Sequence, residues 1–415
     1  MIHNTTLIKN ARLLDPLQAE LLDRHDLLIE GDTIREVSDR PLAAGHARVI
    51  DAGGRTVMPG LIDLHVHVIA VELNLALQAH LPNVLVTLRS VPILRGMLRR
   101  GFTTVRDAGG AGAAFKQAME AGLIQGPRLF VSGRALSQTG GHGDARARSD
   151  YLTAASLCPN CARVGEIARV ADGVDAVRKA AREELQMGAD QIKIMASGGV
   201  ASPTDPIEAF GYSEDEIRAI VAEAAGRQTY VLAHAYTPAT IARAARCGVR
   251  SIEHANRVDA QSAGVMAQCG TYAVPTLVTY DALATEGASL GLPPASVAKV
   301  AEVRDAGLRA LEILKAAGVP MGFGTDLLGA SHRLQSDEFR LRIQVLSPAE
   351  VIASATVVGA ELLGMGQRLG RLAPGALADL LLVDGNPLRS IDCLLGQGEH
   401  IPLVMKGGVV EFQAL

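Results

Sequence analysis

The sequence of 415 residues has no tryptophan, few aromatic residues (3%) and only five cysteines. The scarcity of aromatic side chains argues against a stacking surface for single-stranded nucleic acid. Five cysteines are too few, and odd in number, for a disulfide framework, which favours a reducing compartment. The net charge of −4 does not indicate binding to nucleic acid or to an anionic membrane surface.

Long apolar runs are also missing. No run approaches the roughly 20 residues that a membrane span needs. The chain does not begin with a basic segment followed by an apolar one, as a secretory signal would. A hydrophobic fraction of 48% with 20% charged residues is ordinary for a globular protein. We therefore expect a cytoplasmic enzyme or binding protein with one large and one smaller domain.

Short strand-like segments occur at both ends of the chain. They are residues 6–14, 26–30, 33–37 and 47–50 near the start, and 378–383, 401–405 and 409–412 near the end. Turn residues separate them and no helical period appears between them. Residues 1–58 and 366–415 are therefore predicted to form one small β-sandwich domain.

Residues 59–365 alternate between apolar strand-like runs and helical patterns. The runs are 61–67, 103–107, 128–132, 191–196, 230–235, 251–255, 272–277 and 321–325. Eight such runs predict an α/β fold of the (β/α)8 (TIM) barrel type, with the active site at the carboxyl ends of the strands. A doubly wound sheet is the alternative, but no glycine-rich dinucleotide motif follows the first run. Residues 135–171 are expected to be a long functional loop.

Potential metal ligands stand at the ends of these runs. They are His65 and His67, Lys193, His234, His254 and Asp326. Any one of these residues alone is more often structural than catalytic. Because the carboxyl ends of parallel strands meet at one mouth of a barrel, the whole set predicts a metal site.

Lys193 lies among apolar neighbours on its strand. A buried ammonium is costly unless it loses its proton. The neutral amine can react with CO2 to give a carbamate, an oxygen ligand able to bridge two ions. The alternative is a neutral or ion-paired structural lysine. Nitrogen and oxygen ligands suit Zn²⁺, with Mn²⁺ and Co²⁺ as alternatives.

This ordered set, with the flanking strand-rich ends, resembles the amidohydrolase superfamily. Segments 138–144, 193–199 and 234–237 are similar to its prolidase-like branch, the Xaa-Pro dipeptidases related to imidazolonepropionase. The similarity extends over essentially the whole chain.

The resemblance implies a site with two divalent ions. His65, His67 and Asp326 would bind one ion, His234 and His254 the other, and carboxylated Lys193 and a hydroxide would bridge them. Asp326 would act as general base and acid during hydroxide attack on the amide. By similarity, His142 and Tyr236 would bind the substrate carbonyl oxygen as it becomes an oxyanion. Relatives also suggest a homo-oligomer, possibly an octamer.

Three further features have open interpretations. The loop Gly198-Gly199-Val200 is predicted to bind the substrate α-carboxylate through its N–H groups, or else to be only a tight turn. Cys158 and Cys161 are either a loop disulfide or two thiols. Arg106 and Asp107 are interpreted as a structural ion pair.

The expected activity is hydrolysis of L-Xaa-L-Pro dipeptides or N-acyl-L-amino acids. The branch also suggests an amidase for N-acyl aromatic amino acids, including mycotoxin amides. A second hypothesis is a cyclic-amide hydrolase or deaminase of the imidazolonepropionase type, against which Lys193 argues. A non-enzymatic relative is disfavoured because no ligand is missing.

Overall fold

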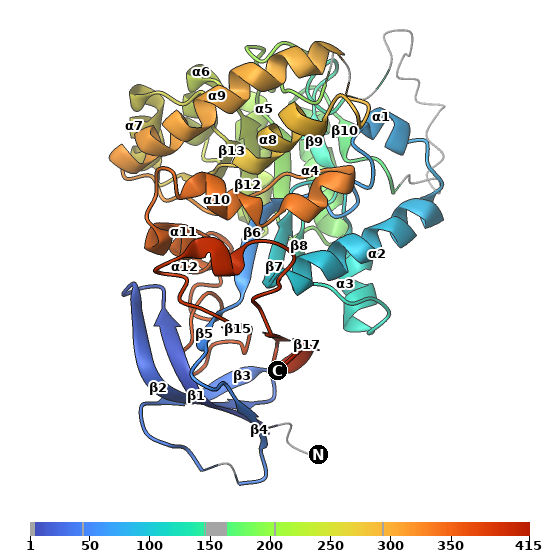
Figure 1. Cartoon of the computed structure of the whole chain (residues 1–415). Coiled ribbons are helices and arrows are strands. Elements are labelled where there is room, and N and C mark those ends of the chain that lie inside the picture. The colour runs from blue at the N-terminus through green and yellow to red at the C-terminus, as the bar shows by residue number, and fades with distance from the viewer. Residues whose placement is uncertain (1–4, 44, 145, 147–163, 203–204, 293) are drawn as a thin grey trace.

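The computed structural model describes residues 5–43, 45–144, 146, 164–202, 205–292 and 294–415. Cys158 and Cys161 lie outside the described residues. Three sheets and the helices around them make up the described part of the chain (Figure 1). Among the described helices, none is long and apolar enough to cross a membrane.

Both ends of the chain contribute to one eight-stranded sheet. Its strands are β1 (Thr5–Asp15), β2 (Glu20–Glu30), β3 (Thr33–Ser38), β4 (Arg48–Asp51), β5 (Thr56–Pro59), β15 (Leu380–Val383), β16 (Leu403–Lys406) and β17 (Val409–Gln413). The prediction that the termini share a sheet is confirmed. We expected a sandwich of two sheets, whereas strand pairing joins these strands into one. The long strand β1 makes the connection, because it pairs with β4 along its first half and with β5 along its second.

The middle of the chain forms two arcs of parallel strands. The first contains β6 (Leu61–Val66), β7 (Phe102–Asp107) and β8 (Arg128–Val131). The second contains β9 (Ala135–Ser137), β10 (Ala168–Val170), β11 (Ile192–Met195), β12 (Val231–Ala235), β13 (Ser251–His254) and β14 (Tyr272–Val274). Strands β6, β7, β11, β12 and β13 are buried along their whole length, as expected for parallel strands covered on both faces.

Backbone hydrogen bonds link the two arcs. On one side, Gly322 donates to Ala273 O (2.8 Å), and Leu64 donates to Phe323 O (2.8 Å). On the other side, Asp190 donates to Val131 O (2.7 Å). The expected order of parallel strands is therefore present. The prediction of an irregular loop over residues 135–171 is wrong at both ends of that segment. Strand β9 begins it and β10 ends it; the two strands pair with each other, and β9 also pairs with β11.

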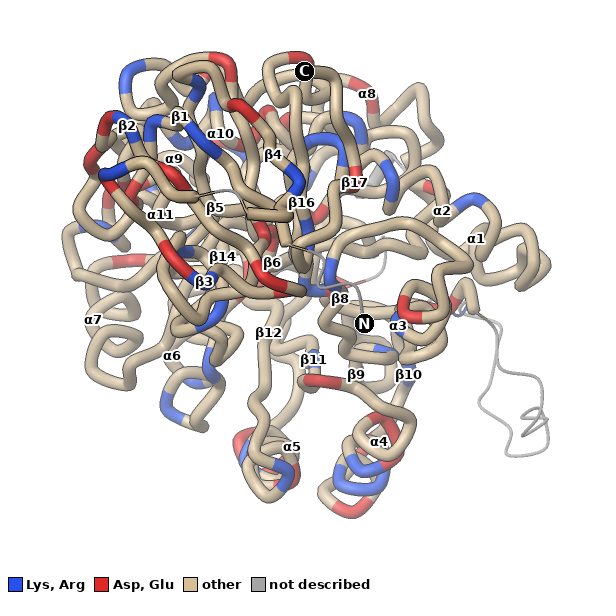
Figure 2. Tube along the Cα trace, turned by 90° about the horizontal axis from the view of Figure 1, so that it is seen from below, with Lys and Arg blue, Asp and Glu red and all other residues tan. Residues whose placement is uncertain are grey.

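Helices cover the outside of the two arcs (Figure 1). They are α1 (Leu75–Gln78), α2 (Asn83–Arg99), α3 (Ala113–Glu120), α4 (Val174–Gln186), α5 (Glu214–Gly226), α6 (Pro238–Arg246), α7 (Ala260–Cys269), α8 (Leu277–Glu286), α9 (Pro294–Ala316), α10 (Asp337–Arg342), α11 (Pro348–Ser354) and α12 (Val357–Leu362), with 3-10 turns η2 (Gly329–Leu334) and η3 (Ile391–Leu394). Both α4 and α5 have acidic and basic residues (Figure 2), and Arg182 of α4 pairs with Glu223 of α5 (2.8 Å).

The terminal sheet packs against the start of β7. Gly101 has a positive φ of 90°, and a Cβ added there would lie 2.8 Å from Leu381 and 3.1 Å from Ile401. Arg99 at the end of α2 donates to the backbone oxygens of Gly398 (2.8 Å) and Ile401 (3.1 Å). The buried side chain of Leu381 therefore belongs to the core that joins the terminal sheet to the parallel strands.

Replacing Leu381 by alanine should lower the free energy of unfolding by about 2–5 kcal/mol, because the change leaves a cavity between the two parts of the molecule. Urea unfolding followed by circular dichroism measures the effect. Leu17→Ala is the matched control, since Leu17 is 51% exposed and its loss should change stability by less than about 0.5 kcal/mol. Equal effects of the two substitutions would contradict this role for Leu381.

Candidate active site

The predicted ligands come together where the parallel strands end. His65 lies near the end of β6 and His67 directly follows it, while His254 is the last residue of β13. Asp326 follows the segment that hydrogen-bonds to β6, and its N–H donates to His65 O (2.8 Å). His254 and Asp326 have positive φ angles of 70° and 53°, a strained conformation for residues other than glycine that often accompanies function.

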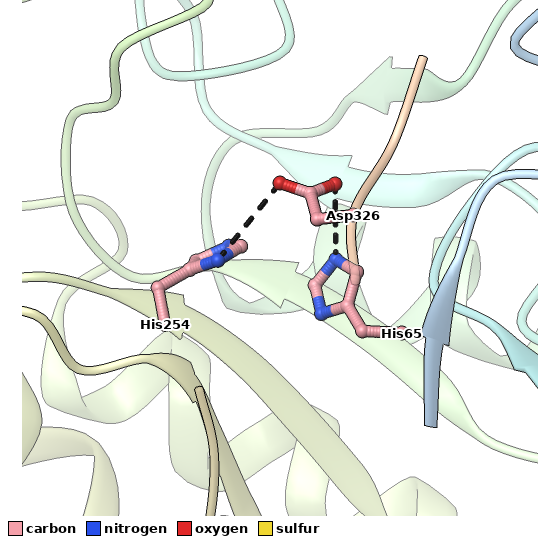
Figure 3. A group of neighbouring side chains, drawn as sticks. All are labelled: His65, His254 and Asp326. Atoms are coloured by element: carbon pink, nitrogen blue, oxygen red, sulfur yellow. Dashed lines mark ion pairs between the residues drawn. The ribbon is translucent and has the colours of Figure 1, made fainter. Parts of the chain in front are cut away.

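Asp326 lies between the histidines. Its Oδ1 is 3.2 Å from Nε2 of His67 and 3.4 Å from Nε2 of His65, and its Oδ2 is 3.9 Å from Nδ1 of His254. Figure 3 shows His65 and His254 facing the same carboxylate from different elements. One ligand atom from each of these three residues lies within 4.8 Å of the other two. Two imidazoles and a carboxylate at this spacing suit a divalent transition metal.

A buried ion pair holds His65 in this orientation. Nδ1 of His65 contacts Glu253 Oε2 at 2.7 Å, and Glu253 accepts two hydrogen bonds from Arg106 (2.9 and 3.0 Å). Burial opposes ionisation of Glu253, but Arg106 and His65 outweigh it and lower the pKa of the carboxyl to about 2. Nε2 of His65 is buried and has no hydrogen-bond partner. An imidazole with one nitrogen bonded to a carboxylate and the other free fits a metal ligand.

Lys193 lies on β11 and is 1% exposed. Burial lowers the pKa of its ammonium to about 8, although Glu253 and Asp326 favour the charged form. A lower pKa increases the fraction of neutral amine near neutral pH, and the neutral amine is the form that reacts with CO2. The environment therefore fits a carboxylated lysine.

The second pair of predicted ligands lies beside the first. The rings of His234 and His254 are 4.7 Å apart between centroids, and His254 is 4.8 Å from His65. Burial holds the pKa of both His234 and His254 well below the usual value, so both rings are neutral. Only neutral imidazole can bind a metal ion.

The two residues expected to contact substrate flank this second pair. The His142 ring stacks on His234 (4.4 Å, 20°), and Tyr236 lies edge-on to His234 (4.8 Å) and 5.4 Å from His254. Tyr236 is buried, and its hydroxyl is 2.7 Å from that of Tyr280.

The loop after β11 supports His142. The N–H of Gly198 donates to Ala209 O (2.9 Å), and that of Gly199 donates to Asp205 Oδ2 (2.8 Å). The N–H groups of Gly198 and Gly199 thus have internal acceptors in this structure, and binding of a substrate carboxylate by this loop stays a prediction. Val200, the third residue of that prediction, is buried. A Cβ on Gly199 would lie 2.3 Å from the His142 ring, so glycine at this position leaves room for that ring.

The sequence analysis did not predict two residues near the site, and it assigned the wrong ion-pair partner to a third. Glu253 and Tyr280 were not predicted to be near the site, although a carboxylate inside a buried strand next to a candidate ligand is unusual. Arg106 was expected to pair with Asp107. Adjacent strand residues point to opposite faces, so Arg106 reaches Glu253 whereas Asp107 accepts backbone N–H groups of Val68, Gly109 and Ala111.

The parallel arcs and the ligand cluster at their ends define an α/β protein with a possible metal site. The model of the amidohydrolase family matches residues 56–410, and the chain belongs to this family. The expected resemblance is therefore confirmed.

Three relatives illustrate the similarity. The crystal structure of an amidohydrolase is 70% identical with a TM-score of 0.97, covering 99% of this chain and all of that one. The crystal structure of a prolidase complexed with N-methylphosphonate-L-proline is 55% identical with a TM-score of 0.96 and the same coverage. Ochratoxinase from Aspergillus niger is 33% identical over 328 residues, 75% of this chain but only 65% of that enzyme.

Glu253→Gln should weaken metal binding about 10- to 100-fold, because the neutral amide no longer favours the His65 tautomer with Nε2 free. Competition with a chromogenic chelator measures the affinity, and circular dichroism verifies the fold. Glu214→Gln is the control, since Glu214 pairs only at the surface with Arg218. Unchanged affinity in a folded Glu253→Gln protein would contradict the role assigned to Glu253.

Proposed function

We propose that the protein is a metal-dependent hydrolase that cleaves the amide bond of L-Xaa-L-Pro dipeptides or related N-acyl-L-amino acids. The observation that carries this proposal is the approach of Asp326 to three histidines (3.2–3.9 Å) beside buried Lys193. The two linked arcs also support a closed (β/α)8 barrel as the scaffold.

The ligand set supports two ions. His65, His67 and Asp326 would bind one, His234 and His254 the other, and carboxylated Lys193 would bridge them. Bound Zn²⁺ or a similar ion would polarise the substrate carbonyl and lower the pKa of a nearby water.

Three side chains would carry out the remaining steps. Asp326 is ionised, because the neighbouring histidines outweigh burial and hold the pKa of its carboxyl well below the usual value. It would accept a proton from the attacking water and deliver it to the leaving nitrogen. His142 and Tyr236 would donate hydrogen bonds to the carbonyl oxygen as negative charge develops on it.

Similarity to the 55%-identical prolidase supports proline as the C-terminal residue of the substrate. Similarity to ochratoxinase supports a second candidate, an amidase for N-acyl aromatic amino acids. The imidazolonepropionase type of reaction is less well supported, because buried Lys193 favours a bridged pair of ions over a single one.

A substrate panel distinguishes these candidates. Wild-type protein loaded with Zn²⁺ should hydrolyse an Xaa-Pro dipeptide with a higher kcat/KM than Xaa-Leu, Xaa-Phe, Xaa-Arg or an N-acyl phenylalanine. Release of the free amino acid, measured by chromatography, provides the rate. A preference for N-acyl phenylalanine would select the amidase. No turnover of any member by fully loaded protein would rule out the proposed function.

The bridging role of Lys193 predicts metal content. Wild-type protein should contain about two ions per chain, and Lys193→Ala should lose at least one of them together with activity. Elemental analysis after dialysis gives the content. Lys179→Ala is the control, because Lys179 is an exposed residue with a side chain 78% accessible. Equal metal content in the two variants would contradict the bridge.

A further inference from the structure

Helix α9 contacts two of the segments that surround the candidate active site. Lys299, near the start of α9, donates hydrogen bonds to the loop that follows β11. Four positions further on, Val303 O accepts a hydrogen bond from Asn256 Nδ2 (3.0 Å), and Asn256 lies two residues after His254. The helix therefore joins the segments that follow β11 and β13.

Lys299 has an acceptor for each of its three N–H donors. Its ammonium group donates to Gly199 O (3.1 Å), Ser202 O (2.8 Å) and Asp205 O (2.5 Å). Hydrogen bonds from a charged donor are about twice as strong as those between neutral groups. One side chain of α9 thus holds three backbone positions of the loop.

The base of this loop is closed by its own backbone. The N–H of Gly198 donates to Ala209 O (2.9 Å), and the N–H of Gly211 donates to Ala196 O (3.0 Å). These two bonds hold the base of the loop close to the end of β11. The bonds from Lys299 reach the loop beyond this closure.

The same loop lies against two residues of the candidate site. Gly198 O is 3.0 Å from Nε2 of His234. A Cβ on Gly199 would lie 2.3 Å from Cε1 and 2.4 Å from Nδ1 of His142, so the backbone at Gly199 supports that ring. Asp205 Oδ2 is 3.5 Å from Nδ1 of His142 and accepts the N–H of Gly199. A displacement of Gly199 would therefore change the surface on which the His142 ring rests.

We propose that Lys299 is a positioning residue that holds Gly199 and Asp205 from α9 and thereby fixes the His142 ring at the substrate carbonyl oxygen. This inference rests on the proposed amide hydrolysis, in which His142 would donate a hydrogen bond to that oxygen. Lys299 acts through the loop, so its loss should impair the chemical step more than substrate binding. Misplacement of a catalytic group by about 1 Å can cost about 100-fold in rate.

The first test compares kcat and KM of wild type and Lys299→Met at equal metal content. Methionine has a side chain of similar length without N–H donors. Lys299→Met should lower kcat at least about tenfold and leave KM within about threefold. Lys315→Met is the matched control, because Lys315 lies on the same helix and pairs with Glu350 at the surface (2.8 Å). The control should have the kcat of wild type.

A milder variant accompanies the first, and circular dichroism verifies the fold of each protein. Lys299→Gln keeps two N–H donors and should have a kcat between those of wild type and Lys299→Met. A wild-type kcat in the folded variants would overturn the inference. A change confined to KM would also overturn it, because the loop would then act on substrate binding and not through His142.

The route through His142 is tested in a second background. Adding Lys299→Met to His142→Ala should cause no further loss of kcat, because the ring that Lys299 positions is then absent. An equal loss in the wild-type and His142→Ala backgrounds would overturn the inference while leaving the proposed function intact.

Failure of the proposed function has a different signature, since wild type itself would then be inactive on the whole panel. Hydrogen exchange measured by mass spectrometry tests the role of Lys299 independently of activity. A peptide that contains Gly199 should exchange faster in Lys299→Met than in wild type, and at the wild-type rate in Lys315→Met. Wild-type exchange in Lys299→Met would overturn the inference whether or not the protein hydrolyses the panel.

Discussion

The ion pair between Arg106 and Glu253 holds the site together from inside the parallel strands. Both side chains are fully buried, and a buried charge is very costly unless it is paired and hydrogen-bonded. Arg106 meets this requirement by also donating to Leu64 O (2.6 Å) and to Ser251 Oγ (3.1 Å), so it connects β7 with β6 and with β13. Glu253 also accepts a hydrogen bond from Ser251 Oγ (2.6 Å) and contacts Nδ1 of His65 (2.7 Å). The orientation of His65, a proposed metal ligand, thus depends on the same contact that joins three strands.

Parallel strands explain how residues far apart in sequence become neighbours. His65 and Glu253 are separated by 188 positions, yet each lies near the carboxyl end of its strand. The loops that follow the strands add the groups that are proposed to contact substrate. His142 reaches the site because Gly199 on another loop lacks a side chain, and Tyr236 reaches it directly after β12. The proposed ligands lie at or just after the ends of the strands, and loops provide the residues proposed to contact the substrate.

The sequence predicted the strand order and the ligand cluster because both depend on local patterns. An apolar run that ends in a histidine or an aspartate can be recognised in the sequence without knowing which residues it contacts. The partners themselves were not visible, since Arg106 and Glu253 are 147 positions apart and lie on strands of different sheets. The neighbours of the loop at Gly198 and Gly199 were not visible for a similar reason. Two glycines indicate a close approach, but only the folded chain shows that the approaching group is the His142 ring and that Asp205 occupies the N–H of Gly199.

The left-handed backbone of His254 and Asp326 has a consequence for the evolution and engineering of this chain. Such conformations cost about 1–3 kcal/mol each for residues other than glycine. The backbone is therefore strained at His254 and Asp326, the two positions at which the proposed function tolerates substitution least. Selection for thermal stability alone would favour glycine or asparagine there, and it would remove two of the proposed metal ligands. Screens for stabilised variants of this enzyme should accordingly hold both positions fixed and seek their gains in the terminal sheet and the outer helices.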